Sequence, residues 1–388
     1  MICRPITAEE YVQAEQVMNI AFRFHWDKPP VNDTGDKHHN LYGAFEGEKM
    51  TSVIYANPFT CTYFGQDVGM LGVGGVSTLP EYRREGHIRH LLTHILQECY
   101  KKGDVLSSLY PFSHPFYRKF GFENGQYMNK LFLETAELRQ FPVTGQVRQF
   151  MPGQDEGEIK AIYNAFIANR NFAVRRGDWE WNDLKKDPYL THVHTYLWYT
   201  EEGKAEAYFT LHHEEREGKC YVLRDWAFLT SRAVRGVFGF LGLLAPGGDK
   251  TEIWLPGDVT PFLMFQEPYA VRVEHTSRGM IRVLNVEKAL QLHPYEEGAA
   301  FTLQVKDEQI EENCATFAVQ KKEGQTLVSR TEEAPDAVLS IQAFSLLCCG
   351  VNSLEELAFN REDVDVNKNR DVLQKAFIPN HNYLREDF

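Results

Sequence analysis

A chain of 388 residues is too long for one compact core, and its length predicts two or three domains. Hydrophobic residues make up 43% and charged residues 24%, a balance that excludes a disordered chain. The net charge of −13 disfavours nucleic acid as a partner and favours cationic small molecules. No apolar run approaches the roughly 20 residues of a membrane span, and no secretory signal is visible, so we expect a cytoplasmic protein without a membrane span.

Cysteine and histidine lack the spacing that metal sites require. The 14 histidines show no HExxH helix and the cysteines form no CxxC pair, so we expect no metal. An odd number of scattered cysteines favours reduced thiols over disulfides. Cys99 and the pair Cys348-Cys349 lie in apolar patterns typical of a core, which argues against a nucleophilic cysteine. The seven cysteines are Cys3, Cys61, Cys99, Cys220, Cys314, Cys348 and Cys349.

The first block of the chain alternates helix and strand signals. Apolar residues at helical spacing predict a helix over residues 8–22 and another over 88–99, which ends before Gly103. Because a helix separates the last two predicted strands, we expect a right-handed crossover and an α/β sheet with partly parallel strands. The predicted strands are residues 41–45, 51–55, 70–78 and 105–110.

The order helix, hairpin, strand and helix returns in a second block, so we interpret the two blocks as diverged copies. A third block has the composition of a small α+β domain. We therefore predict a mixed α/β (α+β) chain with domains at residues 1–146, 147–285 and 286–388. The elements predicted in the later blocks are helices near 159–166, 237–244, 344–347 and 354–359, and strands at 195–199, 205–211, 222–228, 301–305, 316–319 and 338–341.

A strand-to-helix turn within residues 73–89 carries the clearest chemical signal. Arg83, Arg84 and Gly86 stand in this turn, directly before the second helix. Unpaired backbone N–H groups at a helix N-terminus, the helix dipole and two guanidinium groups can hold a pyrophosphate, and the glycine allows close approach. The turn is neither a P-loop nor a dinucleotide-binding loop. The alternative is a surface turn whose arginines serve solubility.

This turn resembles the acyl-CoA pyrophosphate loop of the GNAT superfamily of N-acetyltransferases, except that Ile88 replaces the second small residue. The resemblance implies that acyl-CoA is bound by the turn and by the strand before it, whose backbone N–H groups would polarise the thioester carbonyl. The cofactor-binding residues implied in this way are Val76, Ser77, Thr78, Arg83, Arg84, Glu85, Gly86, His87 and Ile88.

A second segment, Phe116 to Phe122, resembles the GNAT segment whose tyrosine faces the thioester. The tyrosine here is Tyr117. A phenol with a reference pKa of about 10 is suited to protonating a departing CoA thiolate. Taken alone, the segment is more typical of an aromatic residue that anchors a short helix. Its place downstream of the turn favours the catalytic interpretation.

Nearly the whole chain is similar to the Eis (enhanced intracellular survival) family of acetyltransferases. The resemblance implies tandem GNAT folds, with a degenerate second copy, followed by a sterol-carrier-protein-like domain. Residues 226–236 match the position of the first copy's turn but have no arginine at the places equivalent to Arg83 and Arg84, so we expect no cofactor there. The resemblance also implies acetyl-CoA as co-substrate and a homo-oligomer, by analogy a hexamer.

The same resemblance assigns a catalytic role to Phe388, whose terminal carboxylate would enter the first domain's active site opposite Tyr117. With a reference pKa of about 3.5, this carboxylate would either assist deprotonation of an amine or attract an ammonium group. The alternative is a frayed terminus, which is the usual fate of last residues.

The acceptor implied is a primary amine, such as an aminoglycoside, a polyamine or a lysine-like amine, acetylated directly in a ternary complex. Phe24, Trp26 and Asp27 follow the first helix, where GNAT proteins commonly build the acceptor site. Their aromatic and acidic character suits such an amine, with ordinary helix-to-loop packing as the alternative. The other interpretation of the chain is a carrier or sensor of acyl-CoA or lipid without catalysis. The combination of turn, tyrosine and terminal carboxylate favours an enzyme.

Overall fold

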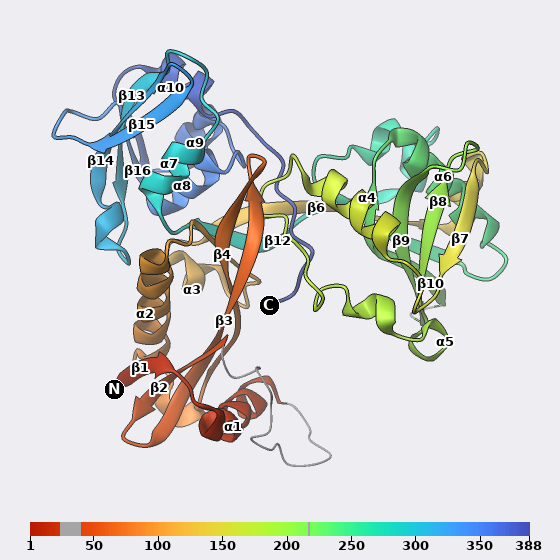
Figure 1. Cartoon of the computed structure of the whole chain (residues 1–388), viewed down its shortest axis with the longest axis horizontal. Helices are drawn as coiled ribbons and strands as arrows, with labels where there is room; N and C mark the ends of the chain where they lie inside the picture. Colours follow the sequence, from red (N-terminus) through yellow and green to blue (C-terminus); the bar gives the residue numbers. More distant parts are fainter. Residues whose placement is uncertain (24–39, 216–217) are drawn as a thin grey trace. The chain divides into compact units, whose positions relative to one another are not determined.

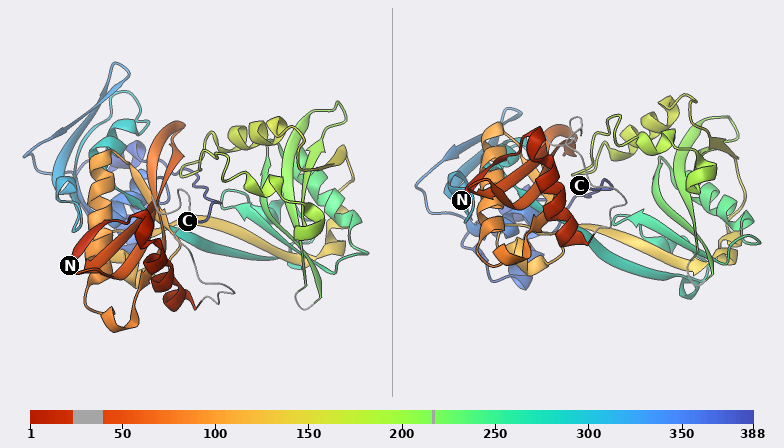
Figure 2. Two further views of the ribbon diagram at one scale, coloured as in Figure 1. Left: turned by 60° about the horizontal axis from the view of Figure 1, so that its bottom comes forward. Right: turned by 90° about the horizontal axis from the view of Figure 1, so that it is seen from below.

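The computed structural model describes residues 1–23, 40–215 and 218–388, which form two compact units. Unit 1 contains Met1–Gly125, Gly279–Asn380 and Asp387–Phe388, and unit 2 contains Gln126–Arg278 and His381–Glu386. Figures 1 and 2 show the elements of each unit, coloured along the chain. The last eight residues are therefore divided between the two units, while the domain boundaries proposed at 146 and 285 stay a prediction.

A mixed sheet forms the N-terminal part of unit 1, in the strand order β1-β2-β3-β4-β5-β12. β4 and β5 are parallel, and they pair from Met70 with Leu106 to Val73 with Leu109, as the predicted crossover requires. The other pairs are antiparallel. The strands are β1 (Ile2–Pro5), β2 (Leu41–Glu46), β3 (Lys49–Tyr63), β4 (Gln66–Thr78), β5 (Leu106–Leu109) and β12 (Arg272–Val283).

In the described residues, this sheet is accompanied by the helices α1 (Tyr11–Phe22), α2 (His87–Lys102) and the five-residue α3 (His114–Arg118). The apolar face of α2 packs on Leu71 and Val73 of β4 in one buried cluster. Burial of each such side chain contributes roughly 1.5–3 kcal/mol, so this apolar face stabilises the helix on the sheet. The same apolar face, read as helical spacing in the sequence, predicted α2. The helix ends at Gly103, whose φ of 89° is left-handed and suits glycine.

Unit 2 repeats the strand, helix and strand order of the first copy. Its strand order is β6-β11-β10-β9-β8-β7, and β10 is parallel to β11. The helix between these two strands, α6, packs its Val237, Phe238 and Leu241 into the unit's main core. The elements are β6 (Glu123–Glu134), β7 (Gln146–Phe150), α4 (Gly157–Ile167), α5 (Pro188–Thr191), β8 (Val193–Tyr199), β9 (Ala205–Glu215), β10 (Lys219–Phe228), α6 (Ser231–Leu243) and β11 (Lys250–Pro256).

The C-terminal part of unit 1 is a five-stranded sheet, in the order β15-β14-β13-β16-β17, with four short helices. The strand predicted to reach Ile341 stops one residue earlier, because the Ser340 hydroxyl accepts a hydrogen bond from the Ala343 N–H and caps the next helix. The elements are α7 (Val286–Leu292), β13 (Ala300–Lys306), β14 (Ala315–Lys322), β15 (Gln325–Arg330), β16 (Ala337–Ser340), α8 (Ile341–Cys348), α9 (Leu354–Asn360), β17 (Val364–Val366) and α10 (Arg370–Ala376).

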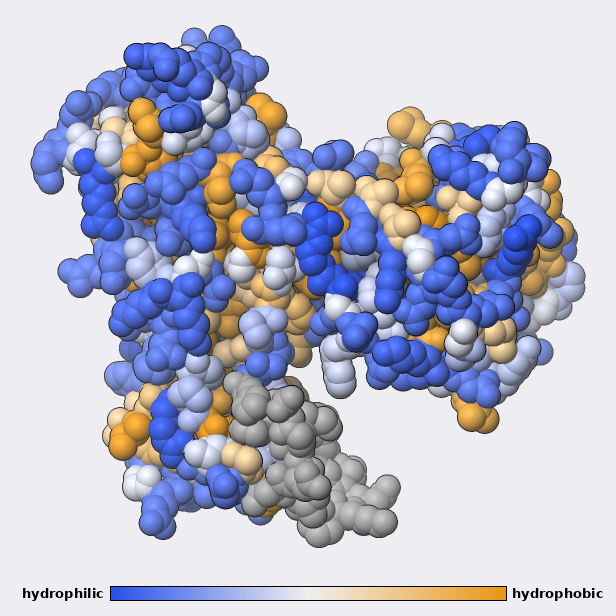
Figure 3. All heavy atoms as spheres, viewed as in Figure 1, coloured by the Kyte–Doolittle hydropathy of each residue, from blue (hydrophilic) through white to orange (hydrophobic). Residues whose placement is uncertain are grey.

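Hydrophilic side chains cover much of the face shown in Figure 3, with hydrophobic residues scattered between them. None of the helices in the described part of the chain has both the length and the apolar character needed to cross a membrane.

Candidate active site

The candidate site begins where β4 and β5 separate. Their pairing ends at Val73 and Leu109, whereas β4 continues to Thr78. The register between β3 and β4 shifts just there, and Gly75 takes a φ of 58°. In the described structure the β5-facing edge of residues 74–78 therefore pairs with no strand. The Gly75 carbonyl accepts a hydrogen bond from the Ser77 hydroxyl at 3.0 Å, and the other backbone groups along this edge could meet a ligand.

The turn from β4 into α2 presents two exposed arginines, Arg83 and Arg84. Arg84 has a φ of 70° and Gly86 a φ of 87°, so two left-handed residues flank Glu85. Gly86 is the N-cap of α2, and this helix start has no side-chain cap. The first-turn N–H groups and the positive end of the helix dipole are thus left for an anion, which fits the pyrophosphate of an acyl-CoA.

His87, the first residue of α2, points inward. It is 4% exposed, and its Nδ1 lies 2.7 Å from the hydroxyl oxygen of Thr51 on β3. Its Nε2 lies 3.5 Å from Glu85 Oε2 and 3.6 Å from Glu46 Oε1, and these three side chains have a spacing that could hold a metal ion. Because both carboxylates are exposed and the imidazole is held by Thr51, we assign His87 a structural role: it fixes the start of α2 on the sheet.

Tyr117 lies on α3 and is 2% exposed, in the same buried cluster as the apolar face of α2. Its ring centroid is 5.2 Å from that of Phe112 and 5.1 Å from that of Phe116. Its hydroxyl has no hydrogen-bond partner among the described residues. Burial raises the pKa of this phenol well above its ordinary value of about 10, so it stays protonated and can donate.

Phe388 is held in place by its ring. The ring stacks on Tyr110 at a centroid distance of 5.3 Å and lies 5.4 Å from the ring of Phe59. Two glycines of β4 make room for it. A Cβ on Gly72 would lie 2.5 Å from the Phe388 ring, and one on Gly74 would lie 2.5 Å from its main-chain oxygen. The chain's last residue is therefore packed against β4.

The two predicted catalytic residues belong to opposite faces of the sheet. Side chains alternate along β4, so Leu71 and Val73 face α2, while positions 72 and 74 face the other way. Tyr117 shares the cluster with Leu71 and Val73, whereas Phe388 packs against the two glycines. The gap between β4 and β5 thus lies between a buried phenol and a main-chain carboxyl group.

The second copy has no equivalent turn. Only two residues separate β10 from α6, and the side chain of one of them, Thr230, accepts a hydrogen bond from the Ala233 N–H and caps the helix. Where β10 and β11 separate, tail residues 382–385 line a cavity of about 20 Å³, room for one water. The capped helix start and the tail residues at this gap therefore distinguish the second copy from the first.

Most sequence-predicted site residues lie in unit 1. Phe24, Trp26 and Asp27 fall within residues 24–39, outside the described part of the chain. Sequence reasoning missed Phe59, Tyr110 and the two glycines that hold Phe388, although glycines at alternate positions of a strand are a signal of close approach by another group. The buried cysteines are poor nucleophiles, because burial raises the thiol pKa of Cys99 and of Cys348 to about 12.

Comparison with known families assigns three parts of the chain. Residues 3–125 match an acetyltransferase (GNAT) domain, residues 173–283 match another acetyltransferase (GNAT) domain, and residues 286–385 match a sterol carrier protein domain. These matches confirm the predicted fold class of two GNAT domains followed by a sterol-carrier-protein-like domain.

Similar proteins extend over most of the chain. A Streptomyces griseus protein described as an uncharacterized N-acetyltransferase is 22% identical over 338 residues, which cover 81% of this chain and 80% of that one. The crystal structure of a GCN5-related N-acetyltransferase from Anabaena variabilis has a TM-score of 0.89 at 20% identity and covers 100% of both chains. Eis1 from Mycobacterium abscessus has a TM-score of 0.81 at 20% identity and also covers 100% of both. The full-length fold is therefore shared with the Anabaena variabilis and Mycobacterium abscessus proteins.

Proposed function

Because the chain belongs to the GNAT-superfamily N-acetyltransferases, which take an acyl-CoA donor, we propose that its first GNAT domain transfers the acetyl group of acetyl-CoA directly to a primary amine. The observation that carries this proposal is the packing of Phe388 at the gap between β4 and β5, with Tyr117 on the other face. A carrier without catalysis has no need of either group at that gap.

The donor would be held by the turn before α2. Arg83, Arg84 and the uncapped helix start would bind the pyrophosphate, and the free edge of residues 76–78 would donate N–H groups to the thioester oxygen. This arrangement places positive charge and backbone donors where negative charge resides or develops. The acyl carbon would then lie in the gap between the two strands.

In the proposed reaction an uncharged amine attacks the thioester carbon, so a C–N bond forms as the C–S bond breaks. Tyr117 donates its proton to the departing sulfur, and the proton that the amine nitrogen loses returns through solvent to the resulting tyrosinate. Burial keeps the phenol protonated at neutral pH. The Phe388 carboxylate, with a reference pKa of about 3.5, is a weak base, so its main contribution is electrostatic attraction of the ammonium form of the acceptor. The net charge of −13 also favours cationic acceptors.

The test is release of the CoA thiol in the presence of acetyl-CoA and a panel of amines. Spermidine, lysine methyl ester and kanamycin sample the polyamine, lysine-like and aminoglycoside classes. Nα-acetyl-Nε-trimethyl-lysine methyl ester is the matched control for the lysine-like acceptor, since it keeps a positive charge but has no free amine. We expect release with at least one amine and none with the control, and a large loss in Tyr117→Phe. Acetyl-CoA binding without thiol release for any amine would instead favour the carrier.

Two further features stay predictions. The hexamer implied by the Eis resemblance is tested by sedimentation velocity, and the cytoplasmic location is tested by cell fractionation. A monomer in solution would contradict the first prediction without affecting the proposed chemistry, because the residues that carry the proposal all lie in unit 1.

A further inference from the structure

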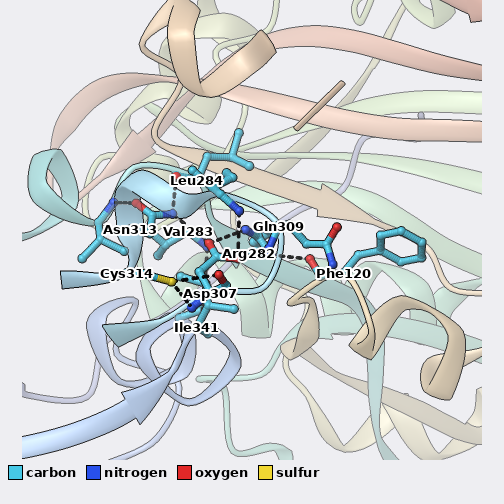
Figure 4. Close-up of polar contacts among 12 residues, drawn as sticks. Phe120, Arg282, Val283, Leu284, Asp307, Gln309, Asn313, Cys314 and Ile341 are labelled. Carbon is cyan, nitrogen blue, oxygen red and sulfur yellow. Dashed lines mark hydrogen bonds and ion pairs between the residues drawn. The ribbon is translucent and has the colours of Figure 1, made fainter. Parts of the chain in front are cut away.

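Three consecutive backbone carbonyls follow Tyr117, and each accepts a hydrogen bond from a side chain far along the chain. The Gln342 amide donates to Arg118 O at 2.8 Å, and the Gln309 amide donates to Lys119 O at 3.0 Å. The Arg282 guanidinium donates to the next carbonyl, that of Phe120 (Figure 4). We call Arg282, Gln309 and Gln342 the carbonyl clamp.

The clamp binds carbonyls at and just after the end of α3, where Arg118 O also accepts a hydrogen bond from the Gly121 N–H at 3.0 Å. α3 has five residues, and the carbonyls at a helix end have no partners within the helix. So short a helix is not stable in isolation, and its position must come from tertiary contacts. Tyr117 lies in the last turn of α3, directly before the clamped carbonyls, so the direction of its side chain depends on where that turn is held.

The Arg282 side chain is held by a buried ion pair and by a close fit to the backbone. It is fully buried and pairs with the equally buried Asp307 at 2.5 Å. Asp307 also accepts a hydrogen bond from the Asn313 amide at 2.8 Å (Figure 4), while Arg282 Nε has no hydrogen-bond partner among the described residues. Buried ion pairs are seldom more stabilising than apolar residues of the same volume, but they fix geometry. Gly121, at a φ of 81°, completes the fit, because a Cβ there would collide with Arg282 Nη1.

Gln309 ties the clamp to the helix that would bind the cofactor. Its side-chain oxygen accepts a hydrogen bond from the Thr93 hydroxyl of α2 at 2.5 Å, while its amide nitrogen donates to Lys119 O. The Gln97 side chain of α2 donates to the Gln309 carbonyl at 3.1 Å. One residue of the sterol-carrier-protein-like domain therefore holds α2 and the turn after Tyr117 in a fixed relation.

We propose that the carbonyl clamp positions Tyr117 for proton donation, so that the sterol-carrier-protein-like domain, through Gln309 and Gln342, contributes positioning residues to the first domain's reaction. The inference rests on the proposed role of Tyr117 as the acid. If the clamp acts in this way, removing it should slow the chemical step, because the Tyr117 phenol would no longer be oriented to donate its proton. Binding of acetyl-CoA at the turn before α2 stays intact.

The test is a double-mutant cycle between the clamp and Tyr117. Gln309→Ala combined with Gln342→Ala removes two clamp bonds and the hydrogen bond from Thr93 to Gln309, and because both glutamines are half-buried the variant should fold. The matched control, Gln320→Ala with Gln325→Ala, changes two exposed glutamines of the same domain's sheet. We expect kcat to fall roughly 10- to 100-fold in the clamp variant, with KM for acetyl-CoA and the melting temperature close to those of the control.

The cycle separates positioning from folding. If the clamp acts through the phenol, adding its two changes to Tyr117→Phe should cost little further activity. Equal turnover in the clamp and control variants, or a full additional loss on top of Tyr117→Phe, would overturn the proposal. Near-normal turnover of Tyr117→Phe alone would remove the proposed acid itself, and a clamp effect seen beside it would then be structural. Arg282→Lys, which keeps one donor, should retain more activity than Arg282→Met.

Discussion

Arg176 and Glu386 form an ion pair that is buried on both sides: Nε lies 2.6 Å from Oε1, and the two side chains are 4% and 5% exposed. The same guanidinium also binds Asp225 through two contacts of 3.0 Å. Burial alone would raise the pKa of Asp225, but Arg176 outweighs burial and the pKa ends below its ordinary value. The second GNAT copy thus fixes the tail two residues before Phe388.

This ion pair predicts that unit 2 supports the reaction by holding the tail. Glu386→Gln keeps the side chain's shape but removes the charge that Arg176 binds, so Asp387 and Phe388 should become less ordered. We expect turnover to fall several-fold while the dissociation constant for acetyl-CoA is unchanged. The neighbouring carboxylate of Asp387 is exposed, so Asp387→Asn serves as the control. Equal turnover in both variants would contradict a role for the anchored tail.

The position of the terminal carboxylate can be moved without disturbing the Phe388 ring. One glycine added after Phe388 leaves the contacts with Phe59 and Tyr110 in place and shifts the carboxylate by about 3.5 Å. We expect at least a tenfold fall in kcat/KM for the amine, since the attraction between the carboxylate and the ammonium group weakens with distance. Acetyl-CoA binding, measured by calorimetry, should stay the same. An unchanged kcat/KM for the amine would show that the carboxylate has no part in the reaction.

Most of the unit 1 fold could be predicted because its elements carry their own signals. α2 has an apolar face at helical spacing and ends at Gly103, and β4 is a β-rich run that leads into a recognisable turn. The long strand β6 was missed. It carries Asn129, a residue type that is depleted in strands. The partners of its side chain, the carbonyl of Val259 and the ring of His275, are distant in the sequence.

The candidate site likewise contains residues that the sequence could identify and residues that it could not. The turn and Tyr117 belong to local motifs, so the sequence could identify them. The carbonyl clamp could not be found in that way, because Arg282 contacts a carbonyl 162 positions earlier and Gln342 one 224 positions earlier. The residues that flank Arg282 and Gln342 in the sequence give no indication of these partners. Such contacts depend on how the chain folds back on itself.

The two arginines of the turn predict a loss in donor affinity. Arg83→Ala with Arg84→Ala removes two exposed guanidinium groups beside an uncapped helix start, so the pyrophosphate would lose its charged partners. We expect KM for acetyl-CoA to rise about tenfold or more, with a smaller effect on kcat. Lys101→Ala, at the other end of α2, is the control. A KM equal to that of the control would locate the donor elsewhere.

The buried phenol predicts the pH dependence of the reaction. Since burial raises the pKa of Tyr117, the protonated donor persists to higher pH than it would in water. The value of kcat/KM for the amine should therefore rise with pH as the free amine forms, with no fall below about pH 10. Tyr117→Phe should lower the whole profile and keep the rising limb. A descending limb that starts near pH 8 in the wild type would assign the acid to another group.

Glu123, the first residue of β6, predicts that the folded protein loses stability in acid. Glu123 is 5% exposed and accepts hydrogen bonds from Arg118 at 2.8 Å and Arg361 at 2.9 Å. Burial alone would raise its pKa, but these arginines and the Asn124 N–H outweigh burial and lower it. The stabilisation is therefore complete above the unfolded-state pKa of about 4.3 and is lost as the pH falls through the lower folded-state value.

Glu123→Gln should accordingly reduce the free energy of unfolding by about 1–2 kcal/mol at neutral pH, a modest value because the Arg118 partner is 46% exposed and screened by solvent. Urea unfolding from pH 7 down to about pH 3 should show the difference from wild type shrinking below about pH 4. Glu134→Gln, at the exposed far end of the same strand, is the control and should show no such dependence. A difference that stays constant with pH would mean that Glu123 contributes through packing alone.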